Sequence, residues 1–79
     1  MKQFVATFHT HLSALMTCRA IQNAGLQAEM VPVPRVLSSS CGTCVFYSAE
    51  DFRKELLDED TEAVYLVEDH NYALVLQFE

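Results

Sequence analysis

Residues 2–34 read KQFVATFHTHLSALMTCRAIQNAGLQAEMVPVP, and this stretch decides the fold. The alternating polarity of Lys2 to Phe8 predicts a β-strand. Leu12 to Ala24 contains no Gly or Pro and gathers apolar residues on one broad face, which predicts a helix. Thr10 stands where an N-cap belongs, and Gly25 stands where a left-handed residue ends a helix. Leu26 to Val31 favours a second strand, which ends at two prolines. The stretch is therefore strand–helix–strand.

The remaining residues predict a second helix and three more strands. Ser48-Ala49-Glu50-Asp51 resembles a capping box, and the apolar stripe behind it predicts a helix that stops near Asp58 or Glu59. Asp69-His70-Asn71 indicates a turn between the last two strands. The three strands are expected at Thr43 to Tyr47, Ala63 to Val67 and Tyr72 to Phe78. Alternation in the last strand predicts one shared face for Tyr72, Leu74, Leu76 and Phe78.

The element order is βαββαβ with a terminal strand, which indicates an α+β fold. Helices on one face of an antiparallel sheet satisfy this order most simply, as in the ferredoxin-like arrangement. Its sheet order is 4-1-3-2, so the fifth strand is expected beside the fourth. The chain has 79 residues, and we expect residues 1–79 to form a single ferredoxin-like domain. Because so small a domain has a thin stability margin, a homo-oligomer that buries more surface is left open.

The charge and hydropathy of the chain exclude several classes of protein. Five Lys and Arg stand against eleven Asp and Glu, for a net charge of −6. The chain has no basic stripe, so binding to nucleic acid or to an anionic membrane is not expected. The late acidic run is expected to be a solvated helix and loop. No window has the apolar length of a membrane span, and no signal-peptide core follows Met1, so the protein is expected in the cytoplasm.

The three cysteines, Cys18, Cys41 and Cys44, have different expected roles. An odd number argues against a disulfide framework and favours a reducing compartment. Cys18 is expected to be a small buried residue in the middle of the first helix. Cys41 lies in a loop of Ser38, Ser39, Ser40 and Gly42, which is hard to explain as core. Cys44 begins a strand, so its side chain points either inward or onto one fixed face.

The expected topology brings the loop cysteines to the turn that precedes the first helix. Cys41 and Cys44 should lie near His9, Thr10 and His11, and His70 should lie at the other end. The free amides of a helix N-terminus favour an anion such as a thiolate. The spacing of Cys41 and Cys44 also suits a pair that forms a disulfide. Together with His9 and His11, the two cysteines could also form a zinc site. The sequence favours neither a metal nor a cofactor over a free thiol, and the serines lack the partners for acyl transfer.

The segment Val31-Pro32-Val33-Pro34-Arg35-Val36-Leu37-Ser38-Ser39-Ser40-Cys41-Gly42 resembles the hallmark of the selenium/sulfur carrier protein-like family, a group of small bacterial domains. The family pattern is Val-Pro-x-Pro-Arg-x-Leu-Ser-x-x-Cys-Gly after a strand–helix–strand. The resemblance covers about residues 4–67. It places the family's cysteine at Cys41, its arginine at Arg35 and its glycine at Gly42. Cys44 is a departure, because it adds a C-x-x-C.

The resemblance implies a small thiol-based carrier rather than an enzyme with turnover. Cys41 would accept sulfur or selenium as a persulfide or its selenium analogue and deliver it to a protein partner. Arg35 could steady an anionic thiolate or substrate. Two alternatives remain open. The chain could be a redox module with a Cys41–Cys44 disulfide, or a non-catalytic domain that binds a partner or a small ligand.

Overall fold

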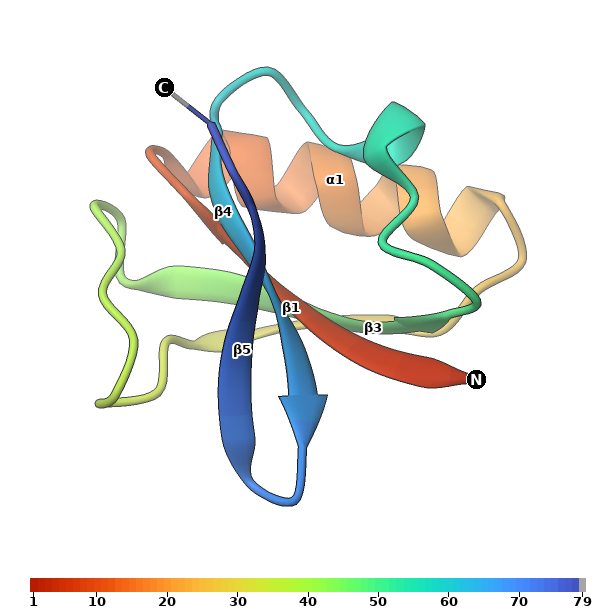
Figure 1. Ribbon diagram of the computed structural model, residues 1–79. Helices are drawn as coiled ribbons and strands as arrows, with labels where there is room; N and C mark the ends of the chain where they lie inside the picture. Colours follow the sequence, from red (N-terminus) through yellow and green to blue (C-terminus); the bar gives the residue numbers. More distant parts are fainter. Residues whose placement is uncertain (79) are drawn as a thin grey trace.

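The computed structural model describes residues 1–78, and it shows one helix packed on one face of a five-stranded antiparallel sheet (Figure 1). The α+β class is therefore confirmed. The sheet order is β2-β3-β1-β4-β5, which is the order expected from the sequence. The elements are β1 (Lys2–Phe8), α1 (His11–Asn23), β2 (Ala28–Pro32), β3 (Thr43–Ala49), the 3₁₀ turn η1 (Lys54–Leu56), β4 (Thr61–Glu68) and β5 (Asn71–Gln77). No helix within residues 1–78 is long and apolar enough to cross a membrane.

Both ends of α1 follow the local signals in the sequence. The Thr10 hydroxyl accepts a hydrogen bond from the Ser13 amide at 3.1 Å, so Thr10 is the N-cap. Gly25 has a φ of 85° directly after the C-cap residue Ala24, a conformation that costs glycine little. The helix begins and ends one residue earlier than predicted.

The prediction of a second helix is wrong, because the only helical turn in residues 50–60 is the three-residue η1. Ser48 lies inside β3 and therefore cannot cap a helix. The Asp51 carboxylate accepts a hydrogen bond from the Arg53 amide at 2.8 Å, which closes a local turn at the point where the helix should begin. Arg53 then adopts a left-handed φ of 50°, which no helix interior contains. The connection from β3 to β4, residues 50–60, is therefore an extended segment with one 3₁₀ turn and not a helix. We call this connection the strap.

The main core lies between α1 and the sheet face that it covers. The alternate residues Phe4, Ala6 and Phe8 of β1 point into it. The Phe4 and Tyr47 rings stack with centroids 5.5 Å apart. The Tyr47 hydroxyl donates to the Phe52 carbonyl at 2.6 Å, which attaches the strap to β3. The other buried members are Ala14, Cys18, Ile21, Val45, Ala49 and Val64.

The prediction of one face for the apolar residues of β5 is wrong. Val64 pairs with Leu76, whereas its neighbour Tyr65 pairs with Leu74, so the register shifts at this point. Neighbouring residues of a strand point to opposite faces, and the shift therefore sends Leu76 and Leu74 to opposite faces. Leu76 packs against the main core, while Leu74 is 52% exposed.

The sheet face turned away from α1, here called the back face, is also partly buried. Val5 and Cys44 are fully buried on it, and Thr7 is 1% exposed. Residues 33–42, here called the Cys41 loop, extend from the ends of β2 and β3 along this side of the molecule (Figure 1). The Val33 amide donates to the Gly42 carbonyl at 3.0 Å, which adds one step to the β2–β3 ladder.

Candidate functional site

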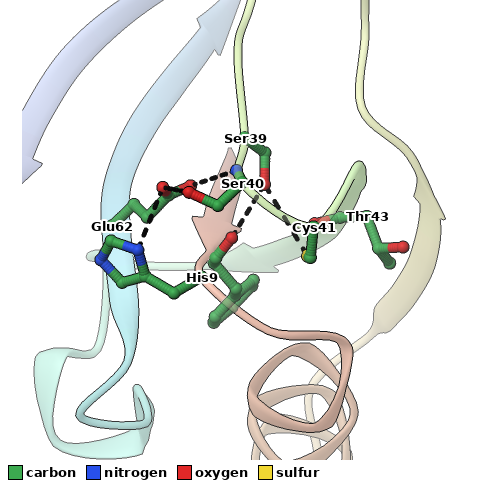
Figure 2. Close-up of polar contacts among 7 residues, drawn as sticks. His9, Ser39, Ser40, Cys41, Thr43 and Glu62 are labelled. Carbon is green, nitrogen blue, oxygen red and sulfur yellow. Dashed lines mark hydrogen bonds and ion pairs between the residues drawn. The ribbon is translucent and has the colours of Figure 1, made fainter.

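The Cys41 loop is attached to the sheet at the two residues directly before the cysteine (Figure 2). The Ser39 hydroxyl donates to the Phe8 carbonyl at 2.9 Å, at the end of β1. Ser40 donates to the Glu62 carboxylate twice, from its amide at 3.2 Å and from its hydroxyl at 2.6 Å. The loop is long, but these bonds define its position immediately before Cys41.

Glu62, near the start of β4, holds the loop and a histidine at once. Its Oε2 lies 3.3 Å from His9 Nδ1 and also accepts the Ser40 hydroxyl. The side chain of Glu62 is 21% exposed and that of His9 is 56% exposed. We call Ser40, Glu62 and His9 the Glu62 clamp. Hydrogen bonds to a carboxylate are stronger than those between neutral groups, so the clamp is the firmest attachment of the loop.

Cys41 is half-buried and packs against the edge of the main core. Its Sγ donates to the Thr43 carbonyl at 3.3 Å and lies 3.8 Å from the Ser39 hydroxyl. A hydroxyl has one proton, and Ser39 gives it to Phe8 when the sulfur is a thiol. When the sulfur is a thiolate, it can no longer donate to Thr43, and the Ser39 hydroxyl is close enough to turn toward it. The site therefore presents an accessible sulfur beside a rotatable donor.

The residues expected near Cys41 lie at this end of the sheet. His9 is joined to the loop through Glu62, and His11 Nδ1 lies 3.4 Å from the Thr43 hydroxyl. Thr10 caps the helix between them. Within residues 1–78, the polar contacts of the Cys41 sulfur are with Ser39 and Thr43 and do not include the first amides of α1.

Cys44 has surroundings very different from those of Cys41. It pairs with Thr7 on the back face, where it is fully buried, and its Sγ lies 3.9 Å from the Pro32 carbonyl. Burial, with a smaller contribution from Cys41, raises the pKa of the Cys44 thiol to about 11. The two sulfurs of the C-x-x-C thus lie on different sides of the sheet, and all three cysteines are free thiols.

Cys18 is buried in the middle of α1, as predicted, and is 5% exposed. Burial raises the pKa of its thiol, although the neighbouring Arg19 opposes the shift. Neither Cys18 nor Cys44 therefore offers a nucleophile to solvent in the folded protein, which leaves Cys41 as the accessible thiol.

Arg35, Ser38 and Gly42 occupy separate parts of the loop. Arg35 is exposed in a turn closed by the Leu37 amide and the Pro34 carbonyl at 3.0 Å. No ion pair or side-chain hydrogen bond of Arg35 occurs within residues 1–78, so the structure does not bring it to Cys41. Ser38 faces a pocket on the back face. Gly42 has a φ of 73°, which a side chain would strain.

Metal-ligand side chains do not converge at this site. Among residues 1–78, no group of three His, Cys, Asp or Glu side chains is arranged to hold an ion. Of the donors expected from the sequence, His9 contacts Glu62, His11 contacts Thr43 and Cys44 is buried on the back face, away from Cys41.

Two acidic residues of the run expected to be solvated have structural roles. Glu62 forms the clamp described above. Asp58 accepts the Ser13 hydroxyl at 2.8 Å, and its amide donates to the Thr17 hydroxyl at 2.9 Å, which attaches the strap to α1. Each of these contacts joins residues more than twenty positions apart, so no local sequence pattern indicates the roles of Glu62 and Asp58.

Comparison with known proteins agrees with the resemblance carried by the Cys41 loop. A family described as "Putative Se/S carrier protein-like" matches residues 3–69. A curated relative, "Uncharacterized protein YtiA" of Escherichia coli (strain K12), is 35% identical over 46 residues, which cover 58% of this chain. The matched part spans 54% of the length of that relative. No solved structure matches the chain.

Proposed function

Because the chain belongs to the Se/S carrier protein-like family, we propose that it carries sulfur or selenium on the Cys41 thiol. The observation that supports this assignment is the position of Cys41, half-buried in a loop held by Ser39 and Ser40, whereas the other two cysteines are buried. A carrier needs an exposed thiol that a donor and an acceptor protein can both reach, and it needs no deep pocket.

The loading step is a transfer of sulfane sulfur. The Cys41 thiolate attacks the terminal sulfur of a persulfide donor, R–S–SH. The bond between Cys41 and that sulfur forms, which makes the Cys41 persulfide. The bond between the two donor sulfurs breaks, and the donor leaves as the thiolate R–S⁻, which takes a proton from water. A selenium atom in the terminal position would transfer in the same way. The Ser39 hydroxyl, 3.8 Å from Sγ, is positioned to donate to the anionic sulfur during the step.

The burial of Cys44 favours a carrier over a redox module. A Cys41–Cys44 disulfide would need Cβ atoms about 3.5–4.5 Å apart, with both side chains on the same side. Cys44 points to the back face and pairs with Thr7, whereas Cys41 packs against the core on the helix side. A sulfur carried on Cys41 is therefore protected from attack by Cys44, which would discharge it as sulfide.

The partner in this proposal is a protein with a basic docking surface. The net charge of −6 would steer a basic partner by long-range attraction. Free thiols persist in a reducing compartment, so the proposal assigns the protein to the cytoplasm, as the odd cysteine count also favours.

The test is intact mass after treatment with a low-molecular-weight persulfide, for the parent protein and two matched variants. We expect a gain of one sulfur in the parent, no gain in Cys41→Ser and an unchanged gain in Cys44→Ser. Sulfide release, followed in parallel, should not increase in the parent relative to Cys44→Ser. Loading that survives Cys41→Ser but is lost in Cys44→Ser would overturn the proposal and move the nucleophile to Cys44.

A further inference from the structure

The two edge strands of the sheet, β2 and β5, differ in how they are protected against pairing with another chain. β2 has only five residues, carries Glu29 and ends at Pro32, and the Gln22 side-chain amide donates to its Ala28 carbonyl at 3.0 Å. Short length, charge and proline are features by which natural proteins keep an edge strand from pairing. β5, Asn71–Gln77, has seven residues and contains neither a charged residue nor a proline. Among the described residues, β5 is therefore the edge that is open to a further strand.

The outward backbone groups of β5 belong to Tyr72 and Leu74. Residues 69–70 form the two-residue turn of the β4–β5 hairpin and have a positive φ at both positions. In a turn of this kind the pair that flanks it is hydrogen-bonded, so the backbone of Asn71 faces β4. Hydrogen-bonded and non-hydrogen-bonded pairs alternate along an antiparallel ladder. Ala73 therefore also faces β4, whereas the N–H and C=O groups of Tyr72 and Leu74 point outward from the edge.

This spacing makes β5 complementary to a second copy of itself. An antiparallel ladder repeats every two residues, so a two-fold axis at Ala73 pairs Tyr72 of each copy with Leu74 of the other. The regular part of β5 before its register shift, residues 71–74, contains all three residues. Ala73 then lies opposite Ala73 of the second copy, where its small, exposed side chain leaves room. Tyr72 and Leu74 share the back face, so each tyrosine ring covers a leucine that is 52% exposed in the single chain.

The charge distribution favours a second copy at β5 over a second copy elsewhere. Each chain has a net charge of −6, so two copies repel when their acidic surfaces meet. β5 has no charge, and Asp69, the acidic residue that comes just before it along the chain, lies outside the paired segment. We propose that the protein forms a symmetric dimer in which two β5 strands pair antiparallel about Ala73 and join the two five-stranded sheets into one. The contact is small, so we expect a micromolar Kd that decreases as salt screens the repulsion.

The test is sedimentation equilibrium of the full chain under reducing conditions, which measures the Kd of the dimer. The parent should show a reversible monomer–dimer equilibrium that is tighter at high salt than at low salt. Leu74→Lys should weaken dimerisation about tenfold or more, because a charge on an edge strand opposes pairing. Leu12→Lys makes the same charge change at a similarly exposed leucine of α1 and should leave the Kd unchanged. A parent that stays monomeric at millimolar concentration, and so leaves β5 to a strand of another protein, or an equal effect of both variants would overturn the proposal.

The position of the two-fold axis is tested by disulfide trapping in the Cys41→Ser background, with oxidised glutathione as the oxidant. Ala73→Cys should cross-link two chains, because the Cα atoms of a non-hydrogen-bonded pair lie about 4.5 Å apart, within the range of a disulfide. Asn71→Cys, on the same face of the same strand, should not, because the two copies of residue 71 lie about 13 Å apart along the strands in this register. Cross-linking of Asn71→Cys as fast as that of Ala73→Cys would overturn the arrangement. None of these readouts depends on persulfide loading, so the two proposals fail separately.

Discussion

Cys41 and Cys44 belong to one four-residue motif, yet they occupy opposite environments. Cys41 is half-buried at the end of its loop, where it packs against the core on the helix side of the sheet, and a hydroxyl lies 3.8 Å from its sulfur. Cys44 is fully buried on the back face, and burial raises the pKa of its thiol to about 11. The difference arises because β3 begins between them, at Thr43. Once a strand begins, alternation assigns each side chain to a face, and sequence spacing no longer implies proximity.

The largest expected effect is on thiol reactivity. At pH 7.5, Cys41 should be alkylated at least about tenfold faster than Cys44 or Cys18, because the buried thiols react only after local opening of the fold. Peptide mapping after short exposure to iodoacetamide measures the three rates. In denaturant the three thiols should react alike, which provides the control. Equal alkylation rates for Cys44 and Cys41 in the folded protein would contradict the difference in accessibility between the two thiols.

The next effect is a loss of stability at alkaline pH that depends on Cys44. Its pKa is about 11 when folded and about 9 when unfolded, so stability is fully present below pH 9 and falls as the pH rises toward 11. The loss over that window is on the order of 2 kcal/mol. Tyr47 and Cys18, whose pKa values burial also raises, add to the decline.

This decline is measured by urea denaturation at pH 8 and pH 10.5 for the parent and Cys44→Ala. The variant should lose less stability between the two pH values, whatever its stability at pH 8. The same decline in both proteins would mean that Cys44 titrates freely and is not enclosed on the back face.

A smaller effect tests whether the Glu62 clamp fixes the position of the Cys41 loop on the sheet. Glu62→Gln should lower the free energy of unfolding by about 1–2 kcal/mol, because Ser40 loses two hydrogen bonds to a charged acceptor. Hydrogen exchange at residues 38–42 should accelerate, and alkylation of Cys41 should become faster. Glu68→Gln, exposed on the same strand, should stay within about 0.5 kcal/mol of the parent. Unchanged exchange in Glu62→Gln would show that the clamp does not hold the loop.

The smallest expected effect concerns Thr7, which lies opposite Cys44 in the β1–β3 ladder. Thr7→Val removes a buried hydroxyl that has no partner within residues 1–78, so the free energy of unfolding should rise by up to about 1 kcal/mol. Thermal denaturation measures the change, with Thr61→Val as the matched variant. The Thr61 hydroxyl donates to the Asp58 carbonyl at 2.6 Å, so its removal should destabilise. Equal destabilisation by both substitutions would mean that the Thr7 hydroxyl is already satisfied by water.

The first half of the fold could be predicted from the sequence because its signals are local. Thr10 caps the start of α1 through a hydrogen bond to Ser13, and Gly25 ends the helix through its left-handed backbone conformation. Alternation in β1 puts Phe4, Ala6 and Phe8 on one face without reference to other strands, and that face is the one in the main core. The placement of His9 and His11 beside the Cys41 loop followed from the strand order alone. The family resemblance is local too, since it depends on one loop motif.

The features that failed or were missed depend on contacts between distant residues. In place of the second helix, Asp58 attaches the strap to α1 through Ser13 and Thr17, more than forty residues away in the sequence. Leu76 reached the core through a register shift in the ladder between β4 and β5, which a single strand does not reveal. Glu62 looked like one more solvated acid until the tertiary structure brought it to Ser40 and His9. Local propensity and capping therefore determined α1, the five strands and the order of these elements. Only tertiary structure decided which side chains meet, because hydrogen bonds and burial between distant residues override local preference.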